Sequence, residues 1–96
     1  MTRTDVLQTL SRYRQRKQDD YKILKLGVFG SVARDQMTDK SDVDVVVELG
    51  YPDLFALVGI KQDLEHLFHR PVDIVHYRKK MNQFLKERID QEAIYV

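Results

Sequence analysis

The segment DVDVVVEL, residues 42–49, constrains the fold of this chain more than any other stretch. It contains four valines and a leucine, which are typical of a buried strand. Asp42 and Asp44 stand at its start, two residues apart. Because side chains alternate along a strand with a period of two, both carboxylates are predicted to point the same way. The sequence therefore aims two acids in one direction from the edge of its own core.

The rest of the chain alternates between helical and strand patterns. Apolar residues at three- and four-residue steps predict helices, and β-branched runs predict strands. The predicted helices cover residues of about 4–18, 31–37, 54–68 and 81–89. The predicted strands cover residues 23–29, 43–49 and 72–77. Asp53 is expected to cap the helix that follows it, and the tail AIYV is expected to pair or dock.

Strands that alternate with helices imply an α/β fold, with a small sheet covered by helices on at least one face. The connections leave strand direction open, so the pattern allows mixed pairing. Leu24, Leu26 and Val28 are expected on one face of the first strand. At 96 residues, the chain is predicted to form one domain, residues 1–96.

The apolar stripe of the helix over residues 54–68 has two interpretations. The first interpretation is that the stripe packs into the core, because such stripes most often pack inward. The second interpretation is that it forms a surface for a protein partner. Exposure of Tyr51 or Phe55 would favour the partner surface.

Composition excludes several classes of protein. The formal net charge is +1, from 16 basic and 15 acidic side chains, whereas a dedicated nucleic-acid binder normally has a clear basic excess. No apolar run approaches the length that spans a bilayer, and the first residues lack the apolar stretch of a signal peptide. The chain has no cysteine, which fits a reducing compartment. We therefore expect a cytoplasmic protein with no membrane association and no direct binding of nucleic acid.

A third acid, Asp73, lies between Val72 and Ile74 in the last predicted strand. Carboxylates embedded in apolar sequence are rare unless they are paired, hydrogen-bonded or bound to a metal. If the second and third strands are neighbours, Asp73 converges with Asp42 and Asp44, and the three would repel one another without a counterion. Hard oxygen ligands without Cys or His indicate Mg²⁺ or Mn²⁺.

The turn at Gly30-Ser31 supplies a complementary feature. Glycine lets the backbone approach a ligand closely, and the Ser31 hydroxyl can donate to a phosphate oxygen. The start of the following helix directs free N–H groups at an anion. Because Mg²⁺ usually completes its shell with water and substrate phosphate, the acids and the turn together predict a ligand that carries phosphate.

The spacing of these residues resembles a known family. Ten residues separate Ser31 from Asp42, and Asp-x-Asp follows. Gly-Ser, ten residues, Asp-x-Asp is the signature of the DNA polymerase β-like nucleotidyltransferases. Together with RPVDIVHY and LKERIDQEAIYV, it resembles the minimal nucleotidyltransferases, the MNT family, over nearly the whole chain. The resemblance implies the polymerase β-like palm fold, a small mixed β-sheet flanked by helices.

The resemblance also implies a reaction, in which an acceptor hydroxyl attacks the α-phosphorus of ATP and pyrophosphate leaves. By this likeness Asp42 and Asp44 hold two Mg²⁺ ions, or Mn²⁺, and Asp73 binds the metal near the acceptor and takes its proton. Gly30 and Ser31 fix the β- and γ-phosphates.

Two roles are open for Arg34 in the reaction that the resemblance implies. It neutralises phosphate charge as part of the nucleotide site, or it pairs with Asp35 or another acid.

Many members of the family are encoded beside a HEPN partner, an all-helical ribonuclease toxin. The resemblance therefore implies an antitoxin that adds AMP to a tyrosine hydroxyl of that toxin. Two alternatives stay open: an antitoxin that neutralises the toxin by binding alone, and a nucleotidyltransferase that acts on a small molecule or on RNA.

Overall fold

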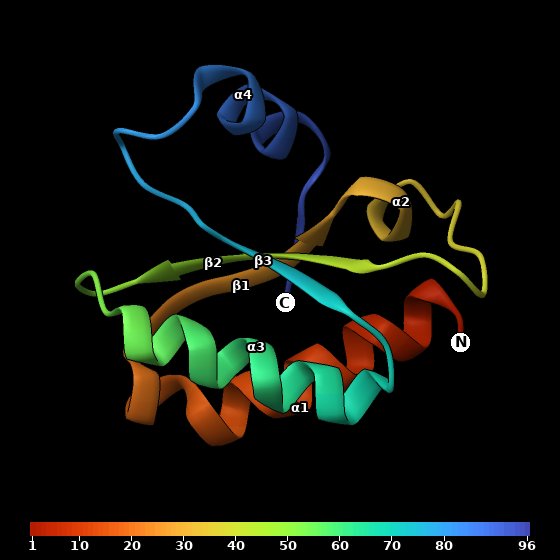
Figure 1. Cartoon of the computed structure of the whole chain (residues 1–96), viewed down its shortest axis with the longest axis horizontal. Helices are drawn as coiled ribbons and strands as arrows, with labels where there is room; N and C mark the ends of the chain where they lie inside the picture. Colours follow the sequence, from red (N-terminus) through yellow and green to blue (C-terminus); the bar gives the residue numbers. More distant parts are fainter.

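A computed structural model describes residues 1–96. Helices and strands alternate along most of the chain, as the sequence predicts (Figure 1). The elements are α1 (Arg3–Tyr21), β1 (Ile23–Phe29), α2 (Gly30–Ala33), β2 (Val43–Leu49), α3 (Leu54–Phe68), β3 (Val72–His76), α4 (Gln83–Glu92) and β4 (Ile94–Tyr95). None of the helices combines the length and the apolar character that crossing a bilayer requires.

The four strands form one mixed sheet in the order β3-β2-β1-β4. β2 and β3 are parallel, while β1 is antiparallel to both β2 and β4. Helices α1 and α3 cover one face of the sheet, and α4 lies over the other (Figure 1). The predicted fold, a small mixed sheet flanked by helices, is confirmed. The tail that was expected to pair or dock forms β4 against β1.

Local signals explain where the long helices begin. At the start of α1, the Thr2 side chain accepts the Asp5 N–H and the Asp5 side chain accepts the Thr2 N–H, which is a capping box. At the start of α3, the Asp53 side chain accepts the Ala56 N–H, so the predicted cap is confirmed. α3 ends where His69 adopts a left-handed backbone conformation, just before Arg70-Pro71.

Apolar side chains pack on both faces of the sheet, but very unequally. The larger cluster lies between the sheet and helices α1 and α3, and it includes the inward-facing valines of β2. The smaller cluster on the opposite face contains three buried residues: Phe29, Val46 and Ile89. Ile89 is the buried residue of α4. Helix α4 is therefore held to the sheet by a small apolar cluster, with Ile89 as its buried side chain.

Two details differ from the sequence-based expectations in strand and turn geometry. The pairing of β1 with β2 shifts between Ile23 and Lys25, and Leu24 is left 52% exposed instead of sharing a face with Leu26. A bulge adds one residue to a strand and so reverses the alternation of side chains beyond it. The short helix predicted over residues 31–37 ends at Ala33, because Asp35 adopts a left-handed conformation.

The apolar side chains of α3 are only partly buried, whereas the whole stripe was expected to pack mainly into the core. The buried line runs in four-residue steps through Ala56, Ile60, Leu64 and Phe68. Other apolar side chains on and just before the helix point outward: Tyr51, Leu54, Phe55, Val58 and Leu67. Phe55 is 88% exposed, which is the condition that favours a partner surface as the second role of this helix.

Candidate active site

The sheet brings Asp44 and Asp73 side by side. The parallel pairing of β2 with β3 makes these two residues direct partners, so their side chains leave the same face of the sheet. This is the face covered by α4, because Val46, two residues after Asp44, packs against Ile89. Asp42 lies immediately before β2. The expectation that the second and third strands are neighbours is confirmed.

The acids differ in their exposure and in their electrostatics. Asp44 is half-buried, whereas Asp42 and Asp73 are exposed. Burial raises the pKa of Asp44 first, and the negative charges of Asp73 and Asp42 raise it further. Arg88 and Arg34 act in the opposite direction and lower this pKa in part. A further positive charge close to Asp44 would therefore stabilise its ionised form.

The donor set suits a hard divalent cation. It consists of carboxylate oxygens without sulfur or imidazole, which is the chemistry that Mg²⁺ and Mn²⁺ accept. No three His, Cys, Asp or Glu side chains converge closely enough to enclose an ion by themselves. Mg²⁺ needs no such enclosure, because it usually binds one or two carboxylates and takes its other ligands from water and phosphate. Asp44 with one neighbouring acid, Asp42 or Asp73, fits such a partial set of one or two carboxylates, whereas a site that encloses one ion with all three acids is not formed.

The Gly30-Ser31 turn lies directly against Asp44. Gly30 follows the last residue of β1 and begins α2 with φ +68°, a conformation that favours glycine. A Cβ at this position would lie 2.1 Å from Asp44 Oδ2, so no other residue fits without displacing the carboxylate. The structure thus brings together the predicted phosphate-binding turn and a predicted metal-binding acid. Ser31 follows as a half-buried residue of α2.

Arg34 pairs with an acid that the sequence did not single out. Its Nη1 lies 2.9 Å from Glu92 Oε2, so of the acids that the second interpretation allows, Arg34 pairs with one other than Asp35. Glu92 also accepts the Gly30 N–H at 3.0 Å and the Arg88 Nε–H at 2.9 Å.

Sequence reasoning missed both Glu92 and Arg88. One available signal was their spacing of four residues on one helix, which allows an ion pair.

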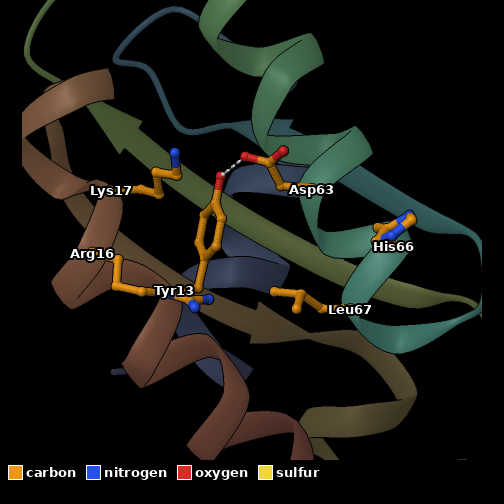
Figure 2. A pocket seen from close by; sticks show the side chains of 6 residues that line it. All are labelled: Tyr13, Arg16, Lys17, Asp63, His66 and Leu67. Carbon is orange, nitrogen blue, oxygen red and sulfur yellow. Dashed lines mark hydrogen bonds between the residues drawn. The ribbon is translucent and has the colours of Figure 1, made fainter.

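A separate hollow of about 480 Å³ lies between α1 and α3, on the opposite face of the sheet from the acids. Figure 2 shows the buried Tyr13 donating its hydroxyl to Asp63, at 2.7 Å. Burial and then this hydrogen bond raise the pKa of Tyr13. The side chains around the hollow are Tyr13, Arg16, Lys17, Asp63, His66 and Leu67 (Figure 2). None of them is a predicted site residue, so the hollow is distinct from the acidic site.

Comparisons with known proteins agree with this geometry. The family profile described as "Nucleotidyltransferase domain" matches residues 10–96. A relative from Methanocaldococcus jannaschii named "Putative protein adenylyltransferase MJ0128" is 30% identical, covering 99% of this chain and 98% of its own. A solved structure described as "Structure of putative minimal nucleotidyltransferase" is 32% identical with a TM-score of 0.72, and the match covers 92% of this chain and 93% of that one.

A further solved structure has the same fold at lower identity. It holds a tri-AMPylated HEPN toxin of Shewanella oneidensis in complex with an MNT antitoxin. The match is 18% identical with a TM-score of 0.65, and it covers 93% of this chain and 70% of that chain. The resemblance inferred from Gly30-Ser31, Asp42 and Asp44 is thus confirmed at the level of the family. The chain belongs to the nucleotidyltransferase domain family, and its fold is that of a minimal nucleotidyltransferase.

Proposed function

We propose that this protein is a Mg²⁺-dependent adenylyltransferase that moves AMP from ATP to a tyrosine hydroxyl of a HEPN ribonuclease toxin, and so acts as its antitoxin. The observation that carries the proposal is the contact between Gly30 and Asp44, which sets the turn predicted to bind phosphate against an acid predicted to bind the metal. The name of the relative, a protein adenylyltransferase, and the AMPylated toxin in the solved complex support the choice of reaction and partner.

Each site residue has a defined task in this reaction. Asp42 and Asp44 hold the metal, and Gly30, Ser31 and Arg34 hold the phosphates. When bound, Mg²⁺ neutralises the charge of the triphosphate and of the leaving pyrophosphate. The tyrosine oxygen forms a bond to the α-phosphorus as the bond from that phosphorus to the bridging oxygen of pyrophosphate breaks.

Asp73 takes the hydroxyl proton in the same step. Its carboxylate is exposed and lies beside Asp44, so a hydroxyl carried by another protein can reach it.

A protein acceptor suits this chain better than a small molecule or RNA. Asp73 lies on β3, at an open edge of the sheet, and apolar side chains such as Phe55 and Leu54 are exposed elsewhere on the surface. The net charge of +1 fits RNA binding poorly. An added AMP group would block RNA from the toxin by its charge and volume. ATP as donor and a ribonuclease as target both assign the reaction to the cytoplasm.

Incubation of the protein with labelled ATP, Mg²⁺ and a HEPN toxin, which we expect to be encoded beside it, tests the proposal. The toxin should gain label, and its intact mass should rise by one AMP for each group added. Asp42→Asn and Asp44→Asn should each abolish labelling. Asp19→Asn, the same change at an exposed position at the end of α1, is the matched control and should label normally. Labelling that survives both site changes would exclude the metal-dependent mechanism.

Protection of cells separates the alternatives. A purely binding antitoxin predicts that the Asp42→Asn and Asp44→Asn variants still neutralise the toxin. An enzyme for small molecules or RNA predicts transfer to a small alcohol or to RNA without labelling of the toxin.

A further inference from the structure

Glu92, the last residue of α4, lies at the centre of a polar cluster beside the predicted phosphate-binding turn. One carboxylate oxygen accepts both the Gly30 N–H, at 3.0 Å, and the Arg88 Nε–H, at 2.9 Å. The other oxygen accepts from Arg34 Nη1 at 2.9 Å. The Glu92 side chain is 18% exposed, whereas those of Arg34 and Arg88 are 42% and 49% exposed. The carboxylate is therefore the enclosed member of the cluster, and the guanidinium groups reach the surface.

Local electrostatics disfavour a carboxylate at this position. The last turn of a helix carries partial negative charge, and α4 has no basic residue there to offset it. Burial acts to raise the pKa of Glu92, but the hydrogen bonds from Gly30, Arg34 and Arg88 outweigh burial and lower it. A residue that breaks a local preference and is compensated by contacts from a distant turn is typical of a functional site.

The arrangement leaves most of the donor capacity of the arginines free. A guanidinium group has five N–H donors, and Arg88 uses one of them on Glu92. Arg34 uses Nη1 on Glu92 and its Nε on Gln36. Both positive charges reach Asp44, where they lower its pKa against the opposing effects of burial and neighbouring acids. The two groups thus lie near the acidic site, and each has N–H donors that are not used on Glu92.

We propose that Glu92 is a positioning residue for the triphosphate: it fixes the Gly30-Ser31 turn through the Gly30 N–H and holds Arg34 and Arg88 on its flank, where their free N–H groups meet the phosphates. This inference rests on the proposed function and adds Glu92 and Arg88 to it. Glu92 does not contact the reacting atoms. It acts through the turn and the two arginines.

The change Glu92→Gln tests this inference, because the direction of the change in affinity for a nucleotide separates charge from geometry. The amide keeps the shape and an acceptor for the Gly30 N–H, but it loses the charge that holds the arginines. The site also becomes more positive by one charge, so simple attraction predicts tighter binding of an anion. Weaker binding therefore indicates lost geometry. Titration calorimetry with α,β-methylene ATP and Mg²⁺, a pair that cannot transfer AMP, should show Kd raised about tenfold.

Glu87→Gln is the matched control, because it makes the same charge change at an exposed position of the same helix. Its Kd should equal that of the wild type. Unchanged or tighter binding by the Glu92→Gln variant would overturn the inference. A wild-type chain that neither binds the analogue nor transfers AMP would overturn the proposed function itself, so the two failures are distinguishable.

A second variant, Arg34→Lys, distinguishes an effect of Glu92 through Arg34 from a general effect of Glu92→Gln on folding. Arg34→Lys keeps the charge and loses the planar fork of donors. If Glu92 acts through Arg34, the double variant should lose clearly less affinity than the product of the two single losses. Full multiplication of the losses would show that the residues act independently. In AMP transfer, KM for ATP should rise in the Glu92→Gln variant while kcat stays within about threefold, a split that mere loss of structure would not produce.

Discussion

Gly30 and Asp44 are in such close contact that a Cβ on Gly30 would stand 2.1 Å from Asp44 Oδ2. The end of β1 and the start of β2 thus form a single unit, because the turn and the acid fix each other's position. Any side chain at Gly30 must push the carboxylate away and must also adopt φ +68°.

Gly30→Ala should therefore damage both stability and activity. A left-handed conformation costs an alanine about 1–2 kcal/mol, so the free energy of unfolding in urea should fall by at least that amount. AMP transfer should fall at least about 100-fold, because small displacements of positioning groups have effects of this size. Gly50→Ala is the control, since its new Cβ would meet Lys22 Cβ at an ordinary 3.5 Å. Equal activity of the two variants would contradict the role of the turn.

Asp44 should make the stability of the metal-free protein depend on pH. Burial and the nearby acids raise the pKa of Asp44 in the folded state above its value of 3.8 in the unfolded chain. Between these two values the folded state binds more protons, so stability falls as pH rises. Asp44→Asn should remove this loss, and the variant should gain stability relative to the wild type as pH rises from 3 to about 7. Thermal melts across this range, without divalent cations, measure the difference. A constant difference would contradict it.

The hydrogen bond from Tyr13 to Asp63 should stabilise the packing of α1 against α3. Tyr13 is 1% exposed, and its hydroxyl lies 2.7 Å from the carboxylate. Tyr13→Phe should lower the free energy of unfolding by about 1–2 kcal/mol. AMP transfer should not change, because the pair lies on the other face of the sheet from the acids. Tyr51→Phe, at an exposed position, is the control for stability and should leave the free energy of unfolding unchanged.

Helix α4 should depend strongly on Ile89. This side chain is fully buried in the small cluster with Phe29 and Val46. Ile89→Ala should lower the free energy of unfolding by about 2–5 kcal/mol, and it should weaken binding of the ATP analogue by loosening the helix that carries Glu92. Phe84→Ala on the same helix removes an 83% exposed side chain, so it should change stability by no more than about 0.5 kcal/mol. Similar losses in both variants would contradict this account of how α4 is held.

Local patterns were sufficient to predict much of the fold. The bounds of β1, β2 and α3 match the prediction, because each segment combines a strong hydrophobic period with a cap or a turn at its ends. The pairing of Asp44 with Asp73 followed from one assumption, that two strands with embedded acids are neighbours.

Features that depend on distant contacts were not predictable in this way. Leu24 was assigned to the wrong face because a bulge depends on the partner strand. Glu92 reaches Gly30 from 62 residues away, and its spacing of four residues from Arg88 indicates an ion pair on one helix but not a contact with the turn.

The placement of Asp73 on an edge strand has a consequence for the order of events in catalysis. The turn at Gly30 approaches Asp44 from β1, and Asp73 approaches it from β3, at the opposite side. Under the proposed reaction, the donor and the acceptor arrive from different directions and do not obstruct each other's entry. Either substrate can then bind first, and initial-rate kinetics would follow a random sequential scheme.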